Sequence, residues 1–139
     1  MSVTPRQIEL VQTTWEKVVP IADTAADLFY GQLFTIAPQV KPMFPEDMTE
    51  QKKKLMAMIT VAVRGLKNVE ALVPALHKLG AGHVGYGVKD EHYAIVGSAL
   101  LWTLEKGLGD AWTDEVKDAW IAVYTLLADT MKQGAAAAA

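Results

Sequence analysis

The sequence predicts an all-α fold. Apolar residues recur every three or four positions along most of the chain, the spacing of an amphipathic helix, and no segment alternates convincingly as a strand does. Prolines, glycines and capping residues divide these stretches into about six helices. A chain of 139 residues suits one domain with a core of its own. We expect this domain to occupy residues 1–134 and the alanines at 135–139 to form a frayed tail.

Prolines delimit the first two helices. Thr4 starts the motif Thr-Pro-Arg-Gln, a capping box with proline at the first helical position, and this helix is expected to run to Pro20. Small and apolar residues mark one face of a second helix, which Pro38 should stop. Three prolines within residues 38–45 leave room only for tight turns, so they place Phe44 at a corner.

The next two helices carry polar residues on otherwise apolar faces. Asp47, followed three residues later by Glu50, is expected to cap the first of them, and Pro74 is expected in the first turn of the second. Their inward residues share one helical spacing: Gln51, Leu55, Met58 and Ala62 on the first, and Leu72, Leu76, Leu79 and His83 on the second. Glycines at 80, 82, 85 and 87 would let a flat molecule approach the end of the second helix.

Capping residues also open the last two helices. Asp90 is expected to cap a helix that ends at Gly107. Thr113, with two acidic residues in the following turn, is expected to cap a helix that Gly134 closes. Both stretches keep the apolar spacing of amphipathic helices, so each should pack one face against the rest of the domain.

Composition restricts the classes of function. No cysteine is present, so we expect neither a disulfide nor a thiolate metal site. The net charge of −3 argues against nucleic acid as a partner, and the lysines at 52–54 are interpreted as a solvated turn of helix. No apolar run would span a membrane and the first residues do not resemble a signal peptide, so a cytoplasmic protein is expected.

His83 is the most informative candidate for a ligand. The histidines at 77 and 92 are interpreted as surface or boundary residues, and the spacing of all three does not suit a helical multi-histidine metal site. His83 itself lies where its apolar stripe would continue with another leucine. A lone imidazole there is most often an ordinary core residue. As the one strong protein ligand of a metal, it would point to a metal already held by a macrocycle.

The order and spacing of these features resemble the globin family over nearly the whole chain. Gln51 and His83 are 32 residues apart, which is similar to bacterial globins. Residues 83–97 are similar to the corresponding run of flavohaemoglobins and their single-domain relatives. The other residues that match, in chain order, are Trp15, Pro38, Phe44, Trp120 and Tyr124. The resemblance implies a globin fold, with about six to eight helices around a haem pocket.

The resemblance also implies a site. Haem b would be the cofactor, with His83 as the proximal iron ligand and with O2, CO and NO as ligands of the iron. Tyr30 and Gln51, which taken singly would be a core tyrosine and a solvated first-turn residue, would donate hydrogen bonds to the bound gas. Lys54 would reach a propionate or, as an internal ligand, the iron. The residues implied around haem are Phe44, Lys54, Leu55, Leu79, His83, Val88, Tyr93 and Val96.

Two of these residues have more specific implied roles. The backbone carbonyl of Leu79, one turn before His83, would accept the second N–H of the imidazole and fix its orientation. Leu55, one turn beyond Gln51, would limit the space around a bound gas. Phe44, which by itself would be an ordinary core aromatic, would contact haem at its corner.

We expect from the resemblance a globin that binds O2 reversibly for oxygen transport or delivery, with five-coordinate or reversibly six-coordinate iron. The alternatives are a nitric oxide dioxygenase that works with a separate reductase, a haem-based gas sensor, and a haem-free signalling module. Flavohaemoglobins pair a tyrosine like Tyr93 with a glutamate late in the last helix, whereas the corresponding place here is near Ala135. The sequence also leaves no room for a reductase domain after the last helix, so autonomous dioxygenase turnover is not expected.

Overall fold

The computed structural model describes the backbone of residues 3–85 and 90–138, and their side chains except at 82–85, 90, 135, 137 and 138. Within this part the chain is helical and contains no strand, which confirms the all-α prediction. None of the described helices is both long and apolar enough to cross a membrane. The elements are α1 (Pro5–Val18), η1 (Val19–Ile21), α2 (Ala22–Ile36), η2 (Pro38–Met43), α3 (Thr49–Arg64), η3 (Leu66–Asn68), α4 (Val69–Gly85), α5 (Asp90–Leu108), η4 (Gly109–Ala111) and α6 (Asp114–Ala138), where η is a short 3₁₀ helix.

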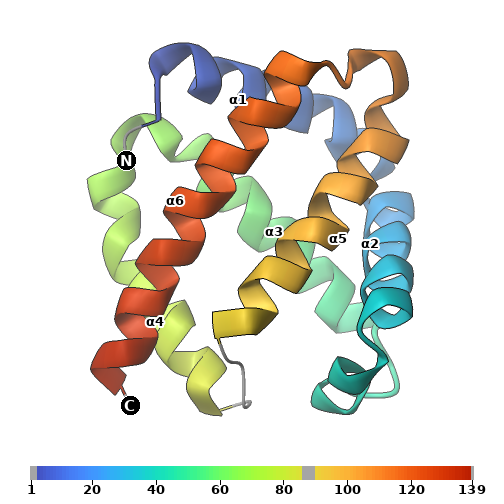
Figure 1. Cartoon of the computed structure of the whole chain (residues 1–139), viewed down its shortest axis with the longest axis vertical. Coiled ribbons are helices and arrows are strands. Elements are labelled where there is room, and N and C mark those ends of the chain that lie inside the picture. Colours follow the sequence, from blue (N-terminus) through green and yellow to red (C-terminus); the bar gives the residue numbers. More distant parts are fainter. Residues whose placement is uncertain (1–2, 86–89, 139) are drawn as a thin grey trace.

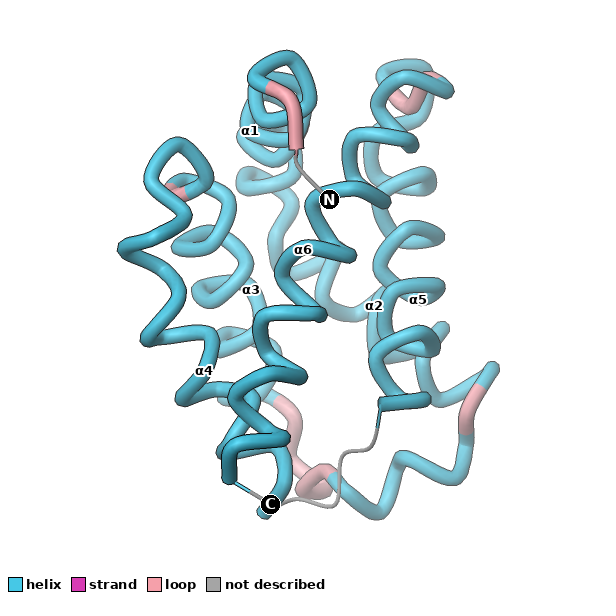
Figure 2. The backbone as a smooth tube through the Cα atoms, turned by 60° about the vertical axis from the view of Figure 1, so that its left-hand side comes forward, coloured by secondary structure: helices cyan, strands magenta, loops and turns pink. Residues whose placement is uncertain are grey.

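Two pairs of helices stand side by side and two further helices cross them. α4 packs along α6 and α2 packs along α5, and these are the two most extensive contacts between the described helices (Figure 1). α1 runs across one end of both pairs, and α3 crosses behind them from the side of α2 toward the side of α4 (Figure 1). The turned view separates α3 and α4 from α2 and α5, with α6 in front (Figure 2). α3 therefore lies against different helices at its two ends.

Two tryptophans form the centre of the core where α1 meets α6. The ring centroids of Trp15 and Trp120 are 5.9 Å apart, and both side chains are buried. Each indole N–H has a hydroxyl acceptor, since Trp120 Nε1 donates to Thr14 Oγ1 at 2.9 Å and Trp15 Nε1 donates to Thr60 Oγ1 at 3.0 Å. Burying these rings stabilises the fold without leaving a polar atom unsatisfied.

Most helix starts agree with the sequence prediction. Thr4 and Gln7 form the predicted capping box, with Pro5 at the first helical position. Val116 N donates to the Thr113 hydroxyl, as expected of a residue that caps α6. The predicted cap of α3 is wrong by one residue, because Met48 precedes the helix while the Asp47 carboxylate accepts from Thr49 N at 3.0 Å.

Two details of the middle helices differ from the prediction. Met58 does not face inward and is 40% exposed. The reason is that Thr60 and Val63 of the same helix pack on α1, which turns the stripe away from Met58. Pro74 lies in the second turn of α4 rather than the first, since the helix already begins at Val69. Pro74 is on the exposed face there, where water can solvate the carbonyl that loses its helical partner.

Two glycines allow α4 and α6 to touch at their backbones. A Cβ added to Gly80 would collide with the carbonyl oxygen of Met131, and one added to Gly134 would collide with the backbone of His77. Gly80 therefore faces α6 rather than a cofactor, contrary to the expectation for this glycine. The prediction that Gly134 ends the last helix is also wrong, because α6 continues to Ala138 and Gly134 is needed inside it for the close crossing.

Candidate functional site

A hydrogen bond between α2 and α3 joins two of the predicted site residues. Gln51 Nε2 donates to the Tyr30 hydroxyl at 3.2 Å. Tyr30 is on the buried face of α2 and is 4% exposed, whereas Gln51 is half-buried near the start of α3. Because the phenol oxygen accepts from Gln51, its own proton can be donated to a third group. The two side chains thus form a compact polar pair between α2 and α3.

Burial keeps the Tyr30 phenol protonated. Desolvation raises the pKa of this phenol above its ordinary value of 10.0, and the hydrogen bond from Gln51 lowers the pKa by a smaller amount. At neutral pH the hydroxyl is therefore a hydrogen-bond donor rather than an anion. This is the state needed to stabilise a ligand that carries partial negative charge.

Aromatic rings surround the polar pair. The ring centroid of Phe44 is 5.6 Å from that of Tyr30, and the two rings are nearly perpendicular. Phe34, one helical turn beyond Tyr30 on α2, is 5.9 Å from Tyr30 and 5.6 Å from Phe44. Phe44 is therefore beside Tyr30, in the corner where the prolines were expected to place it. Phe34 was not predicted as a site residue, although its position four residues after Tyr30 indicates that the two share a helix face.

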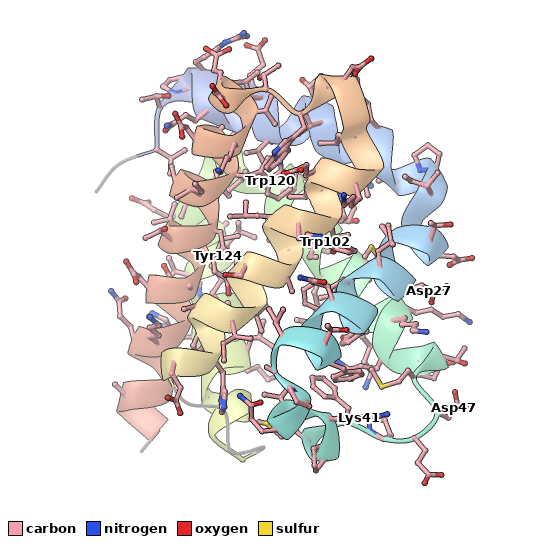
Figure 3. The ribbon with its side chains drawn as sticks, turned by 45° about the vertical axis from the view of Figure 1, so that its right-hand side comes forward. Asp27, Lys41, Asp47, Trp102, Trp120 and Tyr124 are labelled. Atoms are coloured by element: carbon pink, nitrogen blue, oxygen red, sulfur yellow. The ribbon has the colours of Figure 1, made fainter. Side chains whose placement is uncertain are left out.

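An open depression of about 400 Å³ lies on the outer side of these rings. Phe34 and Phe44 line it together with the prolines of η2 and the segment that follows. The Lys41 ammonium lies above the ring of Phe34, with Nζ 6.0 Å from the ring centroid (Figure 3). Phe34 and Phe44 thus lie beside the Tyr30 ring and also line this depression.

The other predicted residues of α3 differ in environment. Leu55 is half-buried and packs on the core one turn after Gln51, so its position suits a residue that restricts space near the polar pair. Lys54 is exposed. Lys52 was interpreted as part of a solvated turn, but its Nζ lies 2.8 Å from Asp27 Oδ1 on α2. This ion pair had no signal in the sequence beyond one acidic and one basic residue on neighbouring helices.

The C-terminal end of α3 is tied to α1 instead. Trp15 Nε1 donates to Thr60 Oγ1 at 3.0 Å, and Gln12 Nε2 donates to the carbonyl of Val63 at 3.0 Å. Arg64 makes two hydrogen bonds to the carboxylate of Glu16, at 3.1 and 3.3 Å. These contacts fix the end of α3 that is remote from the polar pair.

Two predicted site residues of α4 and the segment after it, His83 and Val88, lie wholly or partly outside the described residues. His83 is in α4, but its side chain is not described, and Val88 is not described at all. Leu79 is half-buried one turn before His83. Val96 on α5 is partly buried against the core. The predicted roles of His83, Val88, Leu79 and Val96 therefore remain predictions.

Tyr93 lies in a distinct environment at the α5–α6 contact. It is buried, and its backbone carbonyl accepts a hydrogen bond of 2.6 Å from the Tyr124 hydroxyl. Burial raises the pKa of the Tyr124 phenol far above its ordinary range. Gly97 leaves room for the Tyr124 ring, since a Cβ there would approach its Cε2 atom to 2.8 Å. Lys132 of α6 places its Nζ 5.5 Å from the ring centroid of Tyr93.

Comparison with known proteins supports the class of fold and then defines the family. Residues 27–131 match the family model described as Globin. The anaerobic nitrite reductase of Oryza sativa subsp. indica is 30% identical over 139 residues, covering 96% of both chains. A solved bacterial globin from Campylobacter jejuni superposes with a TM-score of 0.86 and 28% identity, covering 96% of this chain and 97% of that one. The chain belongs to the globin family, whose cofactor is haem.

Similarity to a second group of relatives is limited to part of their length. The flavohemoprotein of Bacillus subtilis is 28% identical over 127 residues, which cover 89% of this chain but 32% of that protein. The chain thus spans about a third of that flavohemoprotein. The polar pair fits haem as the cofactor, because two side chains that can donate hydrogen bonds lie together there, with apolar rings beside Tyr30.

Proposed function

We propose that this chain binds O2 reversibly at haem iron, with His83 of α4 as the protein ligand and Tyr30 and Gln51 as donors to the gas. Haem would supply a ferrous iron that binds a diatomic gas. The observation that carries the proposal is the hydrogen bond from Gln51 to Tyr30, which positions both polar groups together on facing helices.

Tyr30 and Gln51 would favour O2 over less polar gases. A polar gas such as O2 would gain negative charge from ferrous iron, and the Tyr30 hydroxyl and the Gln51 amide would each stabilise that charge by about 1 to 3 kcal/mol. The neighbouring rings of Phe34 and Phe44 would exclude water and strengthen these bonds. Since 1.4 kcal/mol is about a factor of ten in affinity, the pair would make O2 release slow.

The decisive experiment combines an absorption spectrum with Tyr30→Phe. The purified protein should take up haem, and a preparation that takes up none would contradict the proposal. Tyr30→Phe should release O2 about tenfold faster or more, because one donor is lost, while CO release changes far less. Tyr124→Phe is the matched control, since it removes a buried phenol oxygen that bonds the Tyr93 carbonyl instead. An unchanged O2 off-rate in Tyr30→Phe would remove Tyr30 from the mechanism.

The second candidate is consumption of nitric oxide with O2, supported by a separate reductase. The similarity to a flavohemoprotein favours it, because the same polar pair would serve either use. Sustained nitric oxide consumption with an added reductase would decide for the second candidate.

A further inference from the structure

We propose that Asp27 and Lys52 form a latch that controls how long Gln51 stays bonded to Tyr30. The latch would make both residues positioning residues for ligand release. The expected effect on O2 release rests on the proposed function. The contact between Asp27 and Lys52 is a property of the chain itself.

The ion pair and the polar pair join the same turns of the same two helices. Lys52 directly follows Gln51 on α3, and Asp27 precedes Tyr30 by three residues on α2. Lys52 Nζ is 2.8 Å from Asp27 Oδ1, next to the 3.2 Å hydrogen bond between Gln51 and Tyr30. A movement of the first turns of α3 away from α2 would therefore stretch both contacts together.

The start of α3 has few other polar attachments. Met48 precedes the helix and makes no side-chain cap, so the first turn begins without the usual anchoring hydrogen bond at this position. The Asp47 carboxylate bonds Thr49 N but belongs to the same segment, so it does not fix α3 to a neighbour (Figure 3). Among the described residues, the polar bonds from the start of α3 to α2 are those of Gln51 and Lys52.

Solvent exposure makes the latch weak enough to open. The side chain of Asp27 is 67% exposed and that of Lys52 is 35% exposed, so water and salt reach the pair (Figure 3). Exposed ion pairs of this kind change equilibria by factors of about two to five. Opening would withdraw the Gln51 amide while Tyr30, fixed in the buried face of α2, keeps its place.

The kinetic test uses Lys52→Met, which keeps the length of the side chain and removes its charge. O2 release should become about two- to fivefold faster, with CO release unchanged. Lys53→Met is the matched control, because Lys53 is 70% exposed and lies 4.0 Å from Glu50 of its own helix. Lys52→Arg should retain the wild-type rate. Equal rates in Lys52→Met and wild type, or an equal effect of Lys53→Met, would overturn the latch.

Asp27→Asn and the double variant test whether the two residues act through each other. Asp27→Asn should accelerate O2 release as much as Lys52→Met, and combining them should add nothing further. High salt should accelerate release from the wild type and leave Lys52→Met unaffected. Single effects that add in the double variant would mean that the residues act independently, which contradicts the proposal.

Two further measurements separate the latch from a general loss of structure. The C–O stretch of the CO complex should gain a second band in Lys52→Met, because a fraction of molecules lacks the Gln51 amide near the gas. Hydrogen exchange should become faster at residues 49–55 and stay unchanged at residues 60–64. The exchange measurement needs no haem, so absence of haem would refute the proposed function while uniform exchange along α3 would refute the latch.

Discussion

The two ends of α3 are attached in opposite ways. At the C-terminal end, side chains of α1 hold Thr60, Val63 and Arg64 by hydrogen bonds, and the indole of Trp15 is fully buried in the core. At the N-terminal end, Gln51 and Lys52 reach α2 through one hydrogen bond and one exposed ion pair. One helix thus combines an end that several hydrogen bonds anchor with an end that opening of the proposed latch would release.

The polar contacts at the two ends of α3 have different consequences, because one end stabilises the fold and the other is available to a ligand. The buried indole bond satisfies a donor that would otherwise be costly to bury, so it contributes to folding. The Gln51–Tyr30 bond leaves a phenol proton for a third group, so it is available to a ligand. Changes at the two ends should accordingly separate stability from ligand kinetics.

The largest expected effect is on stability and comes from the anchored end. Trp15→Ala removes a ring that is 1% exposed and packs on Trp120, so it should lower the free energy of unfolding by about 3 to 5 kcal/mol. Urea unfolding followed by circular dichroism measures this. Trp102→Ala is the control, because Trp102 is only partly buried. A loss under about 1 kcal/mol would mean that the anchor does not depend on Trp15.

The sequence could predict those parts of the fold and the site that depend on residues close together in the chain. The capping box of α1, the corner at Phe44 and the helix order depend on local patterns, and the structure confirms them. Tyr30 and Gln51 could be paired only through the family resemblance, since no local pattern relates residues on two helices. Their contact with each other is now a property of the structure.

The features that the sequence did not predict depend on contacts between helices. The direction of the α3 stripe is set by Thr60 and Val63 against α1, so periodicity alone placed Met58 wrongly. Three consecutive lysines look alike in sequence, yet successive residues point about 100° apart around a helix. Of these, Lys52 meets an acidic residue of α2. Likewise, Gly134 was expected to end a helix, because the sequence does not show that this glycine contacts the backbone of His77 on another helix.

The next effect concerns the proton of Tyr30, which lies on α2 and faces the N-terminal end of α3 through Gln51. Because burial raises the pKa of this phenol above 10.0, O2 release should be independent of pH from about 7 to 10. Release should accelerate at higher pH, where deprotonation removes the donor. Stopped-flow rates in wild type and Tyr124→Phe should show this rise, and Tyr30→Phe should not. A rise centred near neutral pH would show that another group titrates.

The same raised pKa predicts a loss of stability in alkali. Above pH 10 the unfolded chain releases its phenolic protons more readily than the folded chain, which holds those of Tyr30 and Tyr124. The folded state then binds more protons, so the free energy of unfolding falls as pH rises through the folded pKa values. Circular dichroism at each pH must therefore confirm that the protein stays folded during the kinetic measurement.

The smallest expected effect comes from a second exposed ion pair of α3, which can be compared directly with the pair of Lys52 and Asp27. Arg64 and Glu16 form an ion pair at the anchored end of α3, with side chains 60% and 51% exposed. Arg64→Met should leave the free energy of unfolding nearly unchanged, because solvent screens the pair. It should also leave O2 release unchanged, since the contacts of Trp15 and Gln12 still hold that end. Measuring Arg64→Met beside Lys52→Met therefore compares two exposed ion pairs of one helix. Faster O2 release in both would show that α3 moves as one body, and the distinction between its ends would be wrong.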